Sequence, residues 1–156
     1  MPSFQMPPTY TSSSSYEDPR DHAAQQVQDF LKKIGILESS GGTNLNHPEV
    51  TTGINAGTSA VGKYGLMPLT AQDLDRQYKI NALQGMSKDE VSSKLKEDPS
   101  LQERLAASLA NKLLTKKTPE EAAYSWEQGQ YSQPSQDDLD NSERVRRFKV
   151  LQNAGK

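Results

Sequence analysis

The stretch Leu37–Val50, LESSGGTNLNHPEV, ends an apolar helical pattern on a single carboxylate, Glu38, and continues at once into two serines and two glycines. The C-terminal end of a helix carries partial negative charge, which disfavours an anion there. A carboxyl group that must hold a proton near neutral pH gains from the same placement. The stretch therefore predicts a helix that ends close to a candidate general acid and opens into a glycine-rich loop.

The residues before Glu38 predict the helix itself. Ala23, Val27, Phe30, Leu31 and Ile34 follow one another at helical spacing, Asp21 can cap the start, and Gly35 loosens the end. Residues 1–20, MPSFQMPPTYTSSSSYEDPR, hold four of the nine prolines and a run of four serines, which is typical of a disordered tail. The alternative is a docking peptide that orders on a partner, with Phe4, Tyr10 and Tyr16 as its anchors.

The residues after Glu38 divide into an irregular and a helical part. Residues 39–66 are rich in glycine with short β-branched pieces, which favours a small hairpin or a long ordered loop. About four more helices are expected from Pro68 onward, and residues 130–141 are expected to be a loop. The fold class is therefore α+β, mainly α, with a small β-hairpin or irregular segment after the first helix. The predicted helix starts are Thr70 with Asp73, Ser87 with Glu90, Asp98 before Pro99, Thr118 with Glu121, and Ser142.

Composition excludes several classes of protein. The 156 residues carry 18 basic and 20 acidic side chains, a net charge of −2, which argues against a nucleic-acid binder. The chain has no cysteine, so thiol catalysis, disulfides and cysteine-ligated zinc are excluded, and two histidines cannot form a multi-histidine metal site. No apolar run could span a bilayer and the N-terminus shows no Sec-type signal peptide, so neither membrane insertion nor export by that route is expected.

Two segments together resemble the lysozyme-like lytic transglycosylases and their phage relatives. They are ILESSGGTNLNH, which contains Glu38-Ser39, and GTSAVGKYGLMPLTAQDL, which follows a few tens of residues later. EAAYSWEQGQ and SERVRRFKVL resemble the later segments of that family, so the similarity runs in order over residues 21–153. The resemblance implies one lysozyme-like, peptidoglycan-cleaving domain at residues 21–156, with no metal and no cofactor.

The resemblance also implies a reaction. Glu38 would protonate the leaving oxygen of the β-1,4 bond between N-acetylmuramic acid and N-acetylglucosamine. As a carboxylate it would then take a proton from the 6-hydroxyl of the muramic acid, which closes a 1,6-anhydro ring without water. One alternative is a true hydrolase with Glu49 as the second carboxylate, since Asp73 and Asp75 lie on a later helix. The other is an inactive structural or wall-binding relative.

The remaining site residues each have a structural alternative. Ser39 either contacts substrate or bonds the helix end, and His47 is expected to stabilise its loop rather than to bind metal. Tyr64, Met67, Tyr124 and Trp126 either line the cleft or belong to the core. Arg144, Arg146 and Arg147 are expected on a solvated helix face, with binding of an anionic wall polymer as the minor possibility. The substrate-binding residues implied by the resemblance are Ser39, Ser59, Tyr64, Leu66, Met67 and Tyr124.

Gly65 is the main departure from the family, because a glutamine usually stands at this position. Either the backbone needs a conformation that only glycine adopts easily, or the cleft floor is left open. An open floor is favoured, in which case Gly65→Gln should fold and keep cleavage within about tenfold. The expected partners are peptidoglycan glycan strands and, through the tail, virion proteins. The resemblance places the protein in a phage virion, or in the host cytoplasm until it is released to the wall.

Overall fold

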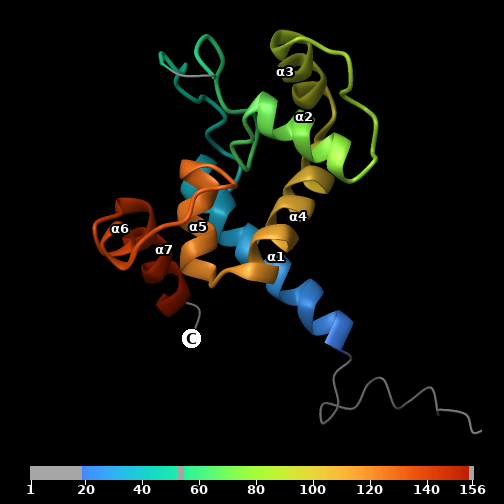
Figure 1. The fold of residues 1–156 in the computed structure, drawn as a ribbon. Coiled ribbons are helices and arrows are strands. Elements are labelled where there is room, and N and C mark those ends of the chain that lie inside the picture. Colours follow the sequence, from blue (N-terminus) through green and yellow to red (C-terminus); the bar gives the residue numbers. More distant parts are fainter. Residues whose placement is uncertain (1–18, 53–54, 155–156) are drawn as a thin grey trace, which may run out of the picture.

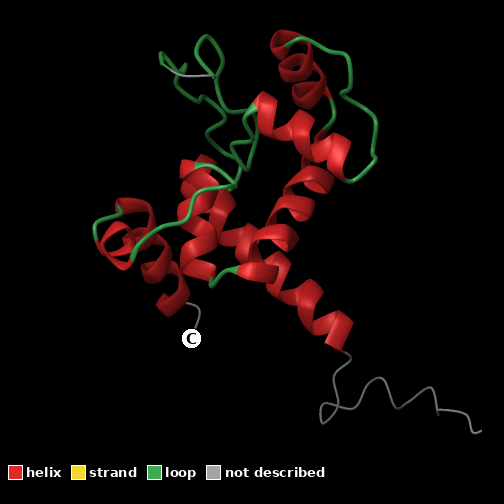
Figure 2. Cartoon of the chain, viewed as in Figure 1, coloured by secondary structure: helices red, strands yellow, loops and turns green. Residues whose placement is uncertain are grey.

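A computed structural model of the chain describes residues 19–52 and 55–154, and this part is mainly helical (Figures 1 and 2). It contains no β-strand; two isolated antiparallel bridges, Glu49 with Ser59 and Val61 with Leu66, hold the segment between the first two helices. The prediction of a mainly α chain is confirmed, and of the two forms expected for residues 39–66 the described residues adopt the irregular one. The helices are α1 (Pro19–Ser39), α2 (Pro68–Gln77), α3 (Lys88–Glu97), α4 (Pro99–Lys116), α5 (Pro119–Gln128), α6 (Gln136–Asp140) and α7 (Glu143–Ala154).

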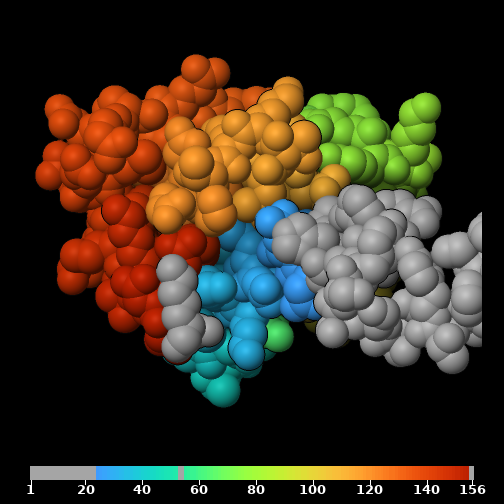
Figure 3. Space-filling model, turned by 90° about the horizontal axis from the view of Figure 1, so that it is seen from below, coloured from blue at the N-terminus to red at the C-terminus, as the bar shows by residue number. Residues whose placement is uncertain are grey.

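Helix α4 connects two groups of helices (Figure 1). At one end it contacts α2 and α3, which pack on each other, and at the other it contacts α1 and α5. Helix α7 packs on both α1 and α5. Seen from below, α1 (blue) lies beside the end of α4 (orange) and the C-terminal helix (red) (Figure 3).

Side-chain caps fix most helix starts where the sequence predicts them. Ser87 and Thr118 form complete capping boxes with Glu90 and Glu121, and the Asp98 carboxylate accepts from the Leu101 amide. Each such cap stabilises its helix by about 1 kcal/mol. Ser142 caps α7 by accepting from the Val145 amide at 3.1 Å.

Three predictions about local structure are wrong. Helix α1 begins at Pro19, so Asp21 lies inside it and does not cap its start, although its other end, at Ser39, lies close to Glu38 as the sequence predicts. Helix α2 begins at Pro68 after an uncapped Met67, since the fixed φ of proline suits the first helical position, and Thr70 and Asp73 form no capping box. The predicted loop 130–141 contains the short helix α6.

The core is built on α4 and an aromatic cluster. Leu101, Leu105, Leu109 and Leu113 are all buried, as their spacing of four predicts. The Phe30 ring lies 5.8 Å from that of Trp126, edge to face, and 5.6 Å from that of Phe148. Aromatic pairs of this geometry add about 1 kcal/mol each beyond the apolar area that they bury. Trp126 is therefore a core residue and not a sugar-stacking one.

The predicted tail falls almost wholly outside the described residues, and with it Phe4, Tyr10 and Tyr16. Among the helices that are described, none has both the length and the apolar content needed to cross a membrane.

Candidate functional site

Glu38 lies in the last turn of α1, one residue before the helix ends. The helix ends as in the αL motif: Ser40 has φ of 54° and its amide bonds the Ile36 carbonyl at 3.0 Å, four residues back, and the Gly41 amide bonds the Gly35 carbonyl at 3.0 Å. Gly41 and Gly42 have φ of 74° and 98°, in the left-handed region that glycine adopts without steric cost. The sequence SSGG therefore stops the helix directly after Glu38 and turns the chain away.

Ser39 joins the end of α1 to the turn at residues 62–65. Its side chain is buried; the hydroxyl oxygen lies 2.7 Å from the Lys63 carbonyl and 3.1 Å from the Gly35 carbonyl, and it accepts from the Gly42 amide at 2.9 Å. The single proton of this hydroxyl and one of its two lone pairs are used inside the protein. Of the two roles that the sequence leaves open for Ser39, the structure supports the helix-end bond, and contact with substrate stays a prediction.

The turn at residues 62–65 places Gly65 directly against Glu38. Val61 and Leu66 exchange backbone hydrogen bonds of 2.8 and 3.0 Å at its base, and Gly65 has φ of 63°. A Cβ atom at Gly65 would lie 2.3 Å from Glu38 Oε1 and 2.8 Å from Cδ. Glycine is needed here both for its backbone conformation and for the space that Glu38 fills. The expectation of an open cleft floor is therefore wrong.

Arg144, from α7, is the ion-pair partner of Glu38. Its Nη2 lies 2.7 Å from Glu38 Oε2 and 3.7 Å from Glu127 Oε2 on α5. The side chains of Glu38 and Arg144 are only 14% and 10% exposed, whereas Glu127 is 42% exposed. The expectation of a solvated face is wrong for Arg144, which packs inward, and holds for the exposed Arg146 and Arg147.

The surroundings of Glu38 favour its protonated form. Burial raises the pKa of this carboxyl above its ordinary value of 4.5 and is the largest effect. The charge and hydrogen bond of Arg144 act in the opposite direction, as does His47 to a smaller extent, while the charge of Glu127 raises the pKa further. The balance is a raised pKa, as required of a general acid that works near neutral pH.

The other residues implied by the resemblance differ in their burial. Tyr64 and Leu66 are buried in the core, which for Tyr64 is the structural alternative that the sequence leaves open, and their contact with substrate stays a prediction. The Tyr64 hydroxyl donates to Glu103 at 3.2 Å, and burial, followed by Glu103, raises the pKa of Tyr64 to about 12. Met67 and Tyr124 are half-buried, and their contact with substrate stays a prediction.

Ser59 and His47 line a separate cavity of about 400 Å³, together with Gly62 and Gln102. His47 Nε2 lies 2.8 Å from the Gly62 carbonyl oxygen, so it has the loop-stabilising role that the sequence predicts. Ser59 forms its bridge with Glu49, an exposed residue. The charges that act on the pKa of Glu38 belong to Arg144, His47 and Glu127, and Glu49 is not one of them.

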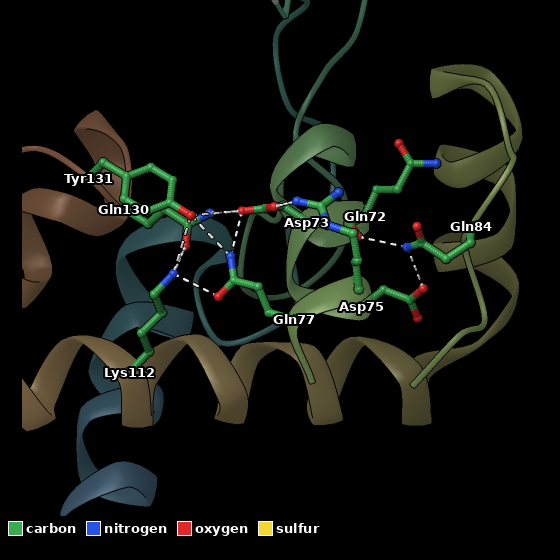
Figure 4. Close-up of polar contacts among 9 residues, drawn as sticks. Gln72, Asp73, Asp75, Gln77, Gln84, Lys112, Gln130 and Tyr131 are labelled. Carbon is green, nitrogen blue, oxygen red and sulfur yellow. Dashed lines mark hydrogen bonds and ion pairs between the residues drawn. The ribbon is translucent and has the colours of Figure 1, made fainter. Parts of the chain in front are cut away.

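Asp73 and Asp75 of α2 are committed to structural contacts (Figure 4). Asp75 is fully buried and accepts from the amides of Ala82 and Leu83 and from the Gln84 side chain. Asp73 pairs with Arg76 and accepts from Gln77 at 2.7 Å, Gln130 at 3.1 Å and the Tyr131 hydroxyl at 3.0 Å. Since Gln130 and Tyr131 follow α5 directly, these bonds tie the end of α5 to α2.

Arg144 and Glu127 are the two site residues that sequence reasoning missed. A signal for Arg144 exists in α7: it lies next to the buried Val145 and four residues before the buried Phe148, on the inward side of the helix. Among the described residues, no group of three or more His, Cys, Asp or Glu side chains could hold a metal ion. Comparison of the chain with protein-family models, curated proteins and solved structures found no match.

Proposed function

We propose that the protein is a lytic transglycosylase of lysozyme-like fold that cleaves the N-acetylmuramic acid β-1,4-N-acetylglucosamine bond of peptidoglycan, with residues 21–156 as the catalytic domain. The observation that carries the proposal is the state of Glu38. It is a nearly buried carboxyl of raised pKa at the end of α1, and the GKYGLMP turn holds it in place. The resemblance to the phage relatives of that family supports a role in wall entry, as part of a virion, or in lysis.

One carboxyl is sufficient for the reaction. Glu38 gives its proton to the glycosidic oxygen as the bond from that oxygen to the anomeric carbon breaks. The resulting carboxylate takes the proton of the 6-hydroxyl of the same muramic acid, whose oxygen bonds to the anomeric carbon. Glu38 ends protonated, as it began, and the product is a 1,6-anhydro sugar.

A structural or wall-binding protein is the second candidate. The Glu38–Arg144 ion pair favours it, because a guanidinium 2.7 Å away stabilises the carboxylate and so opposes the protonated form that a general acid needs. Mass spectrometry of the fragments released from purified cell wall separates the possibilities. A transglycosylase releases anhydro ends, a hydrolase releases reducing ends, and a binding protein releases nothing.

Glu49→Gln is expected to leave both the rate of wall cleavage and the anhydro products unchanged. Glu49 is exposed and does not act on the pKa of Glu38, and the reaction needs no second acid. The measurement is turbidity loss of a wall suspension, followed by mass analysis of the fragments. Loss of activity in this variant, together with reducing ends from the wild type, would favour the hydrolase.

A further inference from the structure

Three charged side chains from three different helices meet at one point. Glu38 comes from the end of α1, Glu127 from the last turn of α5 and Arg144 from the first turn of α7. One guanidinium nitrogen of Arg144 lies between the two carboxylates, 2.7 Å from Glu38 and 3.7 Å from Glu127. Glu38 precedes Glu127 by 89 positions and Arg144 by 106, so only the tertiary fold brings it to them.

Arg144 is fixed in its place by burial. Its other terminal nitrogen, Nη1, is buried and has no hydrogen-bond partner. A buried guanidinium is stable only beside an opposite charge, so the two carboxylates determine where Arg144 points. Glu127 follows Trp126, whose indole N–H donates to the Tyr64 carbonyl at 2.8 Å. Helix α5 is therefore attached to the same turn that carries Gly65.

Glu38 is consequently held from two sides. Gly65 fits against its Oε1 edge, and Arg144 bonds its Oε2. A general acid must point its proton at the leaving oxygen, and an error of about 1 Å in such a group can cost about 100-fold in rate. A fixed guanidinium on one oxygen leaves the other oxygen in a defined direction.

We propose that Arg144 is the positioning residue of Glu38, and that Glu127 in turn holds Arg144. Arg144 keeps one carboxylate oxygen occupied, so that the proton is carried and returned by the other. This inference rests on the proposed function, since the position of Glu38 affects catalysis only if Glu38 is the acid.

The charges around Glu38 predict the direction in which each substitution shifts the pKa of Glu38. The groups that act on it are Arg144 from α7, Glu127 from α5 and His47 from the loop after α1. Arg144 lowers the pKa of Glu38 and Glu127 raises it. Removing Arg144 should therefore let Glu38 keep its proton to higher pH, and removing Glu127 should make Glu38 lose its proton at lower pH.

The experiment is a carbon-13 NMR titration of the Glu38 side-chain carboxyl in the full chain, with the signal assigned by its absence in Glu38→Gln. Arg144→Gln should move the titration midpoint to higher pH, and Glu127→Gln should move it to lower pH. The matched control is Arg146→Gln, an exposed arginine of the same helix that pairs with Glu143, which should leave the midpoint unchanged. Arg144→Lys, which keeps the charge without the planar fork, should fall between the wild type and Arg144→Gln.

Wall cleavage is measured in the same variants as a second readout. Arg144→Gln should lower the rate at the optimum pH by about tenfold or more. The alkaline limb of its pH–rate profile should move to higher pH. A purely structural role would lower the rate without moving that limb. If the titration midpoint of Glu38 is unchanged in Arg144→Gln, the proposal is overturned. If only Arg144→Lys folds, an unchanged midpoint in that variant overturns it. A wild type that titrates as described but releases no wall fragments would instead overturn the proposed function.

Discussion

Glu38→Gln should abolish wall cleavage while the protein stays folded. Glutamine has the shape of a protonated glutamate and can still accept from Arg144, but it has no proton to give. The loss of general-acid catalysis alone should lower the rate roughly 100-fold or more. The measurement is fragment release from purified wall, with circular dichroism as the test of folding. Substantial cleavage by a folded Glu38→Gln protein would remove Glu38 from the mechanism.

The same substitution should change how stability depends on pH. The folded state raises the pKa of Glu38 above 4.5, so it binds this proton more tightly than the unfolded chain does. The wild type should therefore lose stability at this site as the pH rises from about 4.5 through the folded-state pKa. Glu38→Gln removes that contribution. In urea unfolding at several pH values, the free energy of unfolding of the wild type should therefore fall, relative to that of Glu38→Gln, as the pH rises.

Gly65→Ala should damage both stability and cleavage. A side chain at φ of 63° costs about 1–2 kcal/mol by itself. The added Cβ would also lie 2.3 Å from Glu38 Oε1, so the carboxyl group must move. A displacement on the order of 1 Å should lower the cleavage rate about 100-fold. Gly65→Gln carries the same Cβ and should suffer the same loss.

Gly85→Ala is the matched control for the conformational cost. Gly85 has φ of 79°, and a Cβ atom there meets no other atom within 4 Å. Both alanine variants should have a lower free energy of unfolding in urea. Only Gly65→Ala should lose more stability, because its Cβ meets Glu38, and only this variant should lose cleavage. Equal stability losses together with normal cleavage in both variants would show that the turn adapts without moving Glu38.

Local features of the fold could be predicted from the sequence, because they depend on neighbouring residues. A capping serine or threonine bonds a backbone amide three residues ahead, so Ser87 and Thr118 mark their helices without knowledge of the rest of the fold. Helix α6 has the same signature at Ser135 and Asp138 but contains a single apolar residue, Leu139. Because no helical spacing of apolar residues follows this cap, the sequence resembles that of a polar loop.

The contacts of Glu38 could not be predicted in the same way, because they join distant parts of the chain. The sequence supplies a glycine at position 65, but its φ and its distance to Glu38 depend on how the turn folds onto α1. Arg144 belongs to a sequence with three arginines in four positions, RVRR, and only the packing of α7 decides which of them turns inward. The position of Glu38 at a helix end could be predicted, since the next four residues define that end.

Trp126 is the only tryptophan of the chain, and its indole N–H bonds the carbonyl of Tyr64, the residue before Gly65. The fluorescence of the protein under tryptophan-selective excitation therefore comes from one ring attached to the turn that holds Glu38. A ligand or substitution that moves this turn changes the environment of that ring and its emission. The site thus contains its own optical reporter, and binding could be followed in the unlabelled protein.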